Sequence, residues 1–348
     1  MTNKYDYAVF IGRLQPPHNA HIKIIETALE RANEIIIVLG SHRAAPDVRN
    51  PWTTAEREEM TRLCFNAESN SRLHFVAVRD HLYNDTNWMT EVHQRVMQIT
   101  GRNKKIVLLG FKKDRTSRYL DFFPQWDRIH TQCITPVMSA TDIRDQFFEE
   151  GQFHPWHDKD WQFSVHENVY AWLTTFKTTE KYEQLHKSFL FLKEYKEKWA
   201  TAPFQPVFVT TDAVVIASGH VLLVRRKMNP GINLLALPGG FLKQESLLIQ
   251  SMLACLREET KIVYAQETLL AHIKDSKVFD HQDRSLRGRT ITHAFLIKLP
   301  DQGELPEVSA GPDTRNAFWM PLGDIHLHDD EFFEDHTQII QYFTESKW

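Results

Sequence analysis

Cysteine is scarce in this chain of 348 residues, which contains only Cys64, Cys133 and Cys255. An odd and widely scattered set argues against a disulfide framework and predicts a reducing compartment. Long apolar runs are lacking as well. No segment reaches the roughly 18 apolar residues that a membrane span needs, and the N-terminus has no stretch of signal-peptide form. We therefore expect a cytoplasmic protein that has no membrane as a partner.

Neither sign of charge dominates the composition. The chain has 41 Lys and Arg against 45 Asp and Glu, which gives a formal net charge of −4. Nucleic-acid-binding proteins usually show a basic footprint, so nucleic acid is not an expected partner. Acidic small molecules remain suitable substrates, because a few local arginines can hold a phosphate whatever the overall charge.

The length suits two domains of about 150 residues each. In the first half, β-rich runs occur at 7–11, 34–40, 73–78 and 105–110. Between the first two, the apolar residues have helical spacing: Ile25, Ala28, Leu29 and Ala32. Strand, helix and strand in this order predict a parallel βαβ unit with a right-handed crossover. The first region is therefore predicted to be an α/β doubly wound, Rossmann-like domain.

The second half has a different pattern. Residues 177–203 are helical and highly charged, and we interpret them as a connector that ends near Pro203 and Pro206. Two strand runs, 207–215 and 220–225, follow and are joined by Ala-Ser-Gly, which predicts a hairpin. A strand–loop–helix segment and a further strand predict a mixed α+β domain. The expected domains are residues 1–176, the connector 177–203, and residues 204–348.

The junction between the first strand and the first helix carries the clearest functional signal. Gly12-Arg13 ends the strand, and His18 and His21 lie at the start of the helix. A helix N-terminus suits a phosphate group because its free N–H groups and its dipole point toward the ligand. Gly12 allows the backbone to approach closely. The two histidines are three residues apart, so they project from one side of a helical turn and can donate hydrogen bonds to phosphate oxygens.

This region resembles the HxGH nucleotidyltransferases, specifically the archaeal-type nicotinamide mononucleotide (NMN) adenylyltransferases. The segment Arg49-Asn-Pro-Trp-Thr, followed by Glu56-Arg57, is similar to a motif of that family. So is Ser139-Ala-Thr141-Asp-Ile-Arg144. One position departs from the pattern, because Ala20 stands where the family has the glycine of HxGH. We expect its methyl group to modulate the site without abolishing it.

The resemblance implies transfer of AMP from ATP to NMN, which yields NAD and pyrophosphate. The attacking phosphate is already anionic near pH 7, so catalysis consists mainly of positioning and charge neutralisation. The expected catalytic residues are Arg13, His18, His21, Arg49 and Arg144. Those expected to bind ATP are Gly12, Arg13, His18, His21, Ser139, Thr141 and Arg144. By resemblance, Asp80 and Trp88 bind NMN, and the Trp88 ring stacks on the cationic pyridinium.

In the second half, Leu237-Pro-Gly-Gly-Phe opens a segment that ends in Leu-Arg-Glu258-Glu259-Thr. It resembles the Nudix box, in which glutamates bind Mg²⁺ that activates water against a diphosphate. Ile249, Met252, Leu253 and Leu256 are predicted to form a buried helical stripe. The expected metal ligands are Glu258 and Glu259, with Glu245 as a further candidate.

The box is degenerate at several positions. Counted from Gly240, Ser246 takes the first glutamate position, and Ala254-Cys255 replaces the Arg-Glu pair. A neutral thiol is a poor ligand for Mg²⁺, which prefers oxygen. We therefore expect hydrolysis of ADP-ribose-type substrates to be weakened.

The chain as a whole resembles the bifunctional NMN adenylyltransferase/Nudix proteins. The cofactor expected from this resemblance is Mg²⁺ or Mn²⁺, and the small-molecule partners are ATP, NMN, NAD and ADP-ribose. Homo-oligomerisation is left open. Two alternatives also remain at this point: a Nudix domain that only senses nucleotides, and a transferase that acts on another phosphorylated acceptor.

Overall fold

The computed structural model describes residues 5–110, 119–130, 138–149 and 161–345. The chain divides into two compact units, Met1–His186 and Lys187–Trp348. The division falls within helix α7 (Glu180–Glu197), inside the segment expected to be a connector. None of the described helices is both long and apolar enough to cross a membrane. Cys64 and Cys255 are free thiols, and Cys133 lies outside the described residues.

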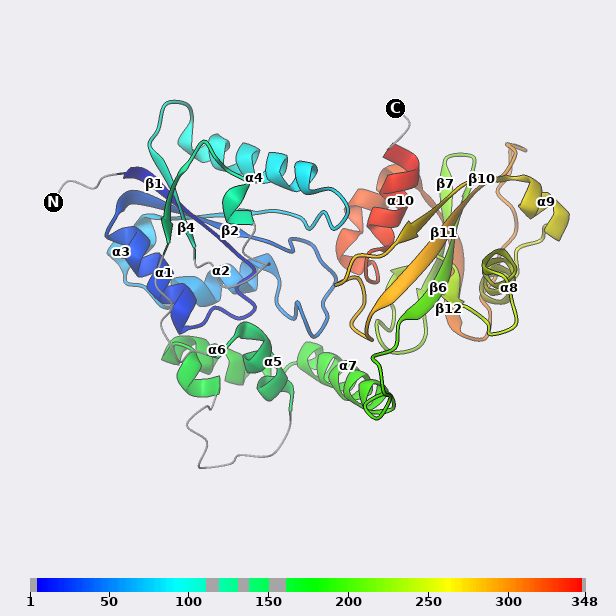
Figure 1. The fold of residues 1–348 in the computed structure, drawn as a ribbon, viewed down its shortest axis with the longest axis horizontal. Coiled ribbons are helices and arrows are strands. Elements are labelled where there is room, and N and C mark those ends of the chain that lie inside the picture. Colours follow the sequence, from blue (N-terminus) through cyan, green and yellow to red (C-terminus); the bar gives the residue numbers. More distant parts are fainter. Residues whose placement is uncertain (1–4, 111–118, 131–137, 150–160, 346–348) are drawn as a thin grey trace. The chain divides into compact units, whose positions relative to one another are not determined.

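The N-terminal unit is built on a parallel sheet with strand order β3-β2-β1-β4-β5 (Figure 1). Its strands are β1 (Tyr5–Gly12), β2 (Ala32–Leu39), β3 (Leu73–Ala77), β4 (Ile106–Gly110) and β5 (Asp127–His130). Its helices are α1 (Asn19–Leu29), α2 (Thr54–Arg62), α3 (Ala67–Ser71), α4 (Asp85–Thr100), α5 (Ala140–Phe148) and α6 (Glu167–Phe176), and a 3₁₀ turn lies at Trp161–Ser164.

Helices cover both faces of this sheet. Alternate residues of β1 point to opposite faces, so Phe10 packs with Ile25 of α1, whereas Val9 packs with Val92 of α4. Strands β1, β2 and β4 are mainly buried and apolar on both faces, as expected for a parallel sheet between helices, whereas the edge strand β5 is polar and largely exposed. This arrangement confirms the predicted doubly wound fold.

One boundary prediction is wrong. Ala32 continues the helical spacing of Ile25 and Leu29, but α1 ends at Leu29 and Ala32 is the first residue of β2, paired with Tyr5. Ala32 is fully buried in the same core cluster as Ile25. The short turn after α1 thus places Ala32 in the core, where a further turn of helix would also place it. The spacing of apolar residues alone therefore cannot show whether the helix ends before Ala32.

The C-terminal unit is built on a seven-stranded mixed sheet in which β6 and β11 pair in parallel. Its strands are β6 (Phe208–Ala217), β7 (His220–Arg226), β8 (Leu235–Ala236), β9 (Gly239–Phe241), β10 (Ile273–Phe279), β11 (Thr290–Lys298) and β12 (Thr314–Pro321). Its helices after α7 are α8 (Leu248–Thr260), α9 (Gln266–Ala271) and α10 (His336–Glu345), with 3₁₀ turns at Leu322–Leu327 and Asp329–Glu331.

Two predicted features of this unit are present. The β6–β7 hairpin turns at Ser218-Gly219, where both residues have positive φ, as a two-residue turn of this kind requires. Helix α8 buries Met252, Leu253 and Leu256 against the sheet, and Ile249 packs at the edge of that cluster. Figure 1 shows α8 and α10 on opposite sides of the sheet. The predicted mixed α+β architecture is therefore confirmed.

Candidate active sites

His18 and His21 lie together at the start of α1, directly after the loop that follows β1. Their rings stack with centroids 3.7 Å apart, and the backbone N–H of His18 donates to His21 Nδ1 at 3.4 Å. Burial and the neighbouring His18 hold the pKa of His21 well below its usual value. His21 is therefore neutral near pH 7, and with Nδ1 accepting, its proton lies on Nε2. It can serve a phosphate oxygen as a hydrogen-bond donor.

Arg144 joins three segments of the N-terminal unit. Its guanidinium is buried and donates to the backbone oxygen of Gln15 (2.6 Å) and of Val48 (3.1 Å), and to Thr141 Oγ1 (3.2 Å). Burial, followed by repulsion from Arg13, lowers its pKa to about 10. The side chain remains charged at pH 7, and it links the start of α5 to the loops after β1 and β2. Three of the predicted motifs are thus brought together through one side chain.

Arg57 makes a second link that sequence reasoning did not assign to the site. It is fully buried on α2 and donates to the backbone oxygen of Arg13 (2.5 Å) and of Gly40 (2.8 Å). Burial is the largest cause that lowers its pKa to about 10. The only sequence signal was the Glu56-Arg57 pair that follows Thr53, which also forms the capping box of α2. The Arg13 side chain itself is exposed.

Ser139 and Arg49, two further residues predicted for this site, lie at the start of α5 and in a turn before α2. Ser139 is the N-cap of α5, and its hydroxyl and backbone N–H both bond to Asp142. The hydroxyl predicted to serve ATP is thus used within the capping box. Arg49 is half-buried, and its backbone N–H donates to Asp47 Oδ1 at 2.8 Å, which fixes the turn that carries it.

The two residues predicted to bind NMN lie on different elements. Asp80 follows β3, and its carboxylate accepts from the backbone N–H of Ser41 (3.2 Å) and from Ser41 Oγ (2.6 Å). Trp88 lies on α4 and is half-buried against Tyr119, Phe122 and Phe123, with ring centroids 6.0–6.4 Å apart. The aromatic neighbours fix the orientation of the indole and leave part of it accessible.

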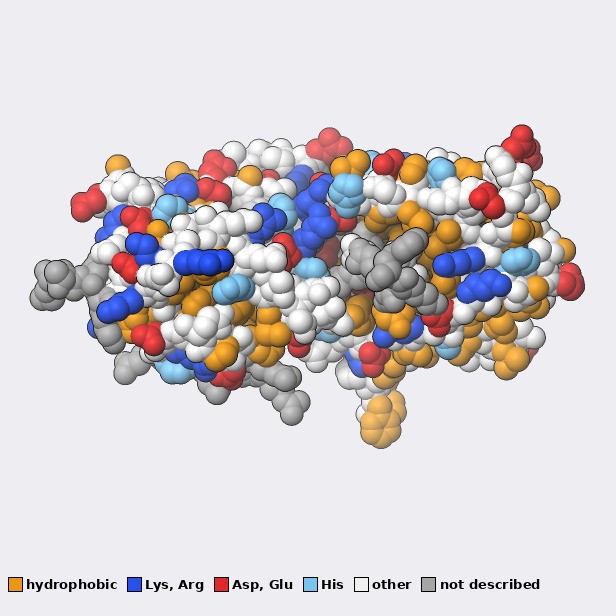
Figure 2. Space-filling model, turned by 90° about the horizontal axis from the view of Figure 1, so that it is seen from above, with side chains coloured by type: hydrophobic (Ala, Val, Ile, Leu, Met, Phe, Trp, Pro, Cys, Tyr) orange, Lys and Arg blue, Asp and Glu red, His pale blue; other side chains and the backbone are white. Residues whose placement is uncertain are grey.

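The C-terminal unit contains a cavity of about 240 Å³ beside β6, β9 and the start of α10. Both acidic and basic side chains line it, together with the exposed ring of Phe241 and the buried ring of Phe333. Its charged and histidine lining residues are Asp212, Arg226, Lys227, Glu259, Arg284, Arg287, Asp313, Glu334 and His336. Figure 2 shows one face of the molecule, on which acidic and basic side chains are scattered among uncharged ones.

The three glutamates predicted to bind metal are not equivalent. Glu259 lines the cavity and accepts a hydrogen bond from the backbone N–H of Gly239 at 3.0 Å. Burial raises its pKa to about 7. Glu258 is directed into solvent, where it pairs with Lys243 at 2.7 Å, and Glu245 is exposed. Consecutive helical residues point about 100° apart, which accounts for the separation of Glu258 from Glu259.

Cys255 is buried beside Gly240, and burial raises its pKa to about 11. The thiol is therefore neutral at the position expected for a box carboxylate. Asp212 on β6, which sequence reasoning missed, lies opposite Gly239 in the strand register. It accepts a hydrogen bond from Thr292, and burial raises its pKa to about 6. Asp212 and Glu259 are thus two cavity carboxylates that flank Gly239, and the box itself supplies only one of them.

Together, the two sites define a class of protein: a nucleotidyltransferase unit joined to a Nudix unit. Residues 9–146 match the Cytidylyltransferase-like family, and residues 207–343 match the NUDIX domain.

The chain is also similar to individual proteins of known name. It is 37% identical over 186 residues to the nicotinamide/nicotinic acid mononucleotide adenylyltransferase of Acinetobacter baylyi, a match that covers 53% of this chain and 94% of the relative. It is similar over 98% of its length, and 99% of the other chain, to the crystal structure of a bifunctional NMN adenylyltransferase/ADP-ribose pyrophosphatase from Francisella tularensis, with 34% identity and a TM-score of 0.90. A second structure of that bifunctional protein is complexed with AMP and a Mn ion (TM-score 0.89, 34% identity, same coverage). The chain belongs to the family of bifunctional NMN adenylyltransferase/Nudix proteins.

Proposed function

We propose that the N-terminal unit transfers AMP from ATP to NMN and thereby forms NAD and pyrophosphate. The observation that carries this proposal is the stacked His18/His21 pair at the start of α1, in a chain of this family. His21 supplies an uncharged Nε2–H donor, and the helix terminus adds its free N–H groups. Arg13 and Arg49 supply positive charge, while Arg144 holds the loops that present them.

In this reaction a phosphate oxygen of NMN attacks the α-phosphorus of ATP. A new P–O bond forms, the bond to the β-phosphate oxygen breaks, and pyrophosphate leaves with its electrons. No side chain has to remove a proton, because the attacking phosphate is already anionic near pH 7. The protein contributes orientation and a positive environment for the negative charge that develops. Mg²⁺ is the expected cation, with ATP as its main source of ligands.

We assign the binding of the acceptor, NMN, to Trp88 and Asp80. The half-buried indole presents an aromatic face to a cationic pyridinium ring, and the Asp80 carboxylate is already oriented by Ser41. A product assay with ATP plus NMN, nicotinate mononucleotide or phosphopantetheine tests this assignment. We expect NAD from NMN. Turnover of phosphopantetheine but not of the pyridine nucleotides would contradict it.

For the C-terminal unit we propose weak hydrolysis of ADP-ribose-type substrates. The cavity provides Glu259, and Asp212 outside the box, as oxygen donors for a divalent cation. Glu258 is paired with Lys243, and Cys255 is a neutral thiol. The donor set therefore fits a divalent cation only in part. The similarity to a bifunctional pyrophosphatase favours slow hydrolysis over a purely sensing role.

Isothermal titration with Mn²⁺, together with an ADP-ribose hydrolysis assay on the full chain, tests the second proposal. We expect weak cation binding and slow turnover to AMP and ribose phosphate. Turnover as fast as that of relatives with an intact box would show that the missing carboxylate is not needed. Binding of ADP-ribose with no turnover under any divalent cation would instead support the sensing role.

A further inference from the structure

The start of α10 brings a histidine into the C-terminal cavity, more than seventy residues beyond the Nudix-like box. Only 5% of His336 is exposed. Its Nδ1 accepts a hydrogen bond from the backbone N–H of Leu237 at 2.8 Å, in the segment that leads to Gly239. An Nδ1 that accepts leaves the proton of a neutral ring on Nε2. Among the described residues, nothing accepts that Nε2–H.

The surroundings favour a neutral imidazole. Burial is the largest cause that holds the pKa of His336 well below its usual value, and repulsion from Arg284, Arg226 and Arg287 adds to it. The ring is therefore a fixed donor of one hydrogen bond and carries no charge of its own. It also packs edge-on against Phe333, with ring centroids 5.7 Å apart.

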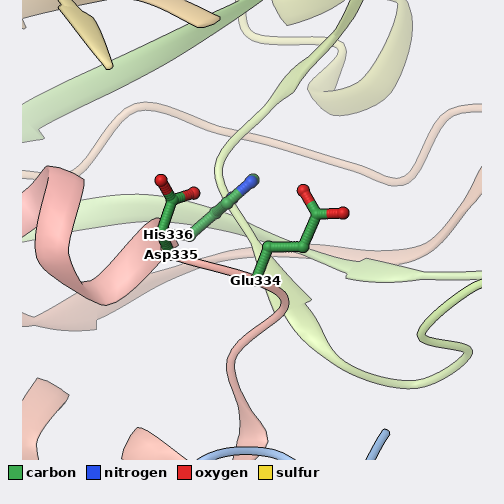
Figure 3. A group of neighbouring side chains, drawn as sticks. All are labelled: Glu334, Asp335 and His336. Carbon is green, nitrogen blue, oxygen red and sulfur yellow. The ribbon is translucent and has the colours of Figure 1, made fainter. Parts of the chain in front are cut away.

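Glu334, Asp335 and His336 are close enough to suggest a cation site (Figure 3). Their partners argue against one. Arg284 binds both oxygens of Asp335, at 3.0 and 2.8 Å, in a fully buried ion pair. Arg287 lies 3.6 Å from Glu334. His336 has used Nδ1, and the nitrogen that remains carries a proton, so it cannot act as a metal ligand.

Arg226 is a further, largely buried cation beside this cluster. Its Nε donates to the backbone oxygen of Pro230 at 3.1 Å. No carboxylate among the described residues bonds to it directly, and Glu334, Glu259 and Asp212 attract it only from beyond salt-bridge distance. Its guanidinium lies 3.9 Å from the centre of the Phe333 ring, and Arg287 lies 5.7 Å from that centre. A largely buried guanidinium with no directly bonded carboxylate favours an anionic ligand.

We propose that His336 is a ligand-binding residue of the C-terminal cavity, whose Nε2–H donates a hydrogen bond to a phosphate oxygen of the nucleotide that Arg226 neutralises. This inference rests on the proposed function of the C-terminal unit. It places a phosphate beside Arg226 and His336, in the cavity that Glu259 and Asp212 also line.

Two substitutions separate the contact with the ligand from the contact with Leu237. In His336→Asn, the amide oxygen lies near the position of Nδ1 and can still accept from Leu237, but the donor at Nε2 is lost. In His336→Gln, a donor is kept near the position of Nε2, and the acceptor for Leu237 is lost. His272→Asn is the matched control, because His272 bonds to Thr268 at the end of α9 and does not line the cavity.

Binding of ADP-ribose to the full chain is measured by calorimetry in EDTA, which prevents turnover, together with thermal unfolding. We expect His336→Asn to keep its Tm and to raise Kd about tenfold or more, since hydrogen bonds to charged groups are strong. His336→Gln should lower Tm and change Kd less, and His272→Asn should change neither. Unchanged affinity in a folded His336→Asn overturns the proposal.

A spectroscopic test on the wild-type protein does not depend on the variants folding. In ¹⁵N-histidine-labelled protein, His336 should show the tautomer protonated at Nε2, and its Nε2–H signal should shift when ADP-ribose is added. A tautomer protonated at Nδ1, or a signal that stays in place at saturating ADP-ribose, overturns the proposal. If the wild type binds no ADP-ribose at all, the proposed function of the C-terminal unit fails instead.

Discussion

Glu259 makes the stability of the C-terminal unit depend on pH in a direction that the structure determines. Burial raises the pKa of this carboxyl from the usual 4.5 to about 7. Below pH 4.5 the group is protonated in both the folded and the unfolded chain and costs nothing. Between pH 4.5 and 7 the unfolded chain ionises first, so stability falls as pH rises and the loss is complete above pH 7. A shift of this size corresponds to about 3 kcal/mol.

Replacing Glu259 by glutamine removes this titration. The amide oxygen can still accept from the backbone N–H of Gly239, so the hydrogen bond at 3.0 Å is kept. We expect the variant and the wild type to be equally stable near pH 4. Near pH 8, in EDTA, the variant should be more stable by about 3 kcal/mol.

Hydrogen exchange of the amides of α8, compared between variant and wild type at each pH, measures this difference within the unit concerned. Glu258→Gln is the matched control, because Glu258 is exposed and adjacent in sequence. It should show a difference that stays small across the same range. A Glu259→Gln difference that does not grow between pH 4 and pH 8 would refute the reasoning from burial.

Three further experiments test the other assignments. Trp88→Ala should raise KM for NMN about tenfold and leave KM for ATP nearly unchanged in steady-state kinetics. Trp88→Phe should keep the aromatic packing and most of the affinity for NMN. Equal effects of Trp88→Ala on both KM values would argue for a packing role. Arg144→Lys removes the planar guanidinium that reaches three oxygens, so we expect Tm and kcat to fall together. A fall in kcat with an unchanged Tm would instead indicate direct contact with phosphate. Ala254→Arg combined with Cys255→Glu should raise ADP-ribose hydrolysis at least about tenfold, with Cys255→Ser as the control. No increase would indicate that Ser246 is also limiting.

The sequence alone predicted the two folds and their order. Strand runs closed by glycine, the helical spacing before 34–40 and the hairpin at Ser218-Gly219 are local signals, because each depends on the period of one element or on one turn. The position of His18 and His21 followed in the same way, since a strand end and a helix start are adjacent in sequence. Family motifs then supplied the substrate, which no local pattern contains.

Only the tertiary structure decided which side chains share a site. Neighbours such as Glu258 and Glu259 differ by one step of a helix, and that step places one in solvent and the other in a cavity. Asp212 and His336 meet this cavity from elements more than a hundred residues apart, so no spacing in the sequence reveals them. Burial raises the pKa of Glu259 and lowers that of His336, and it is a property of the packed unit rather than of any single segment.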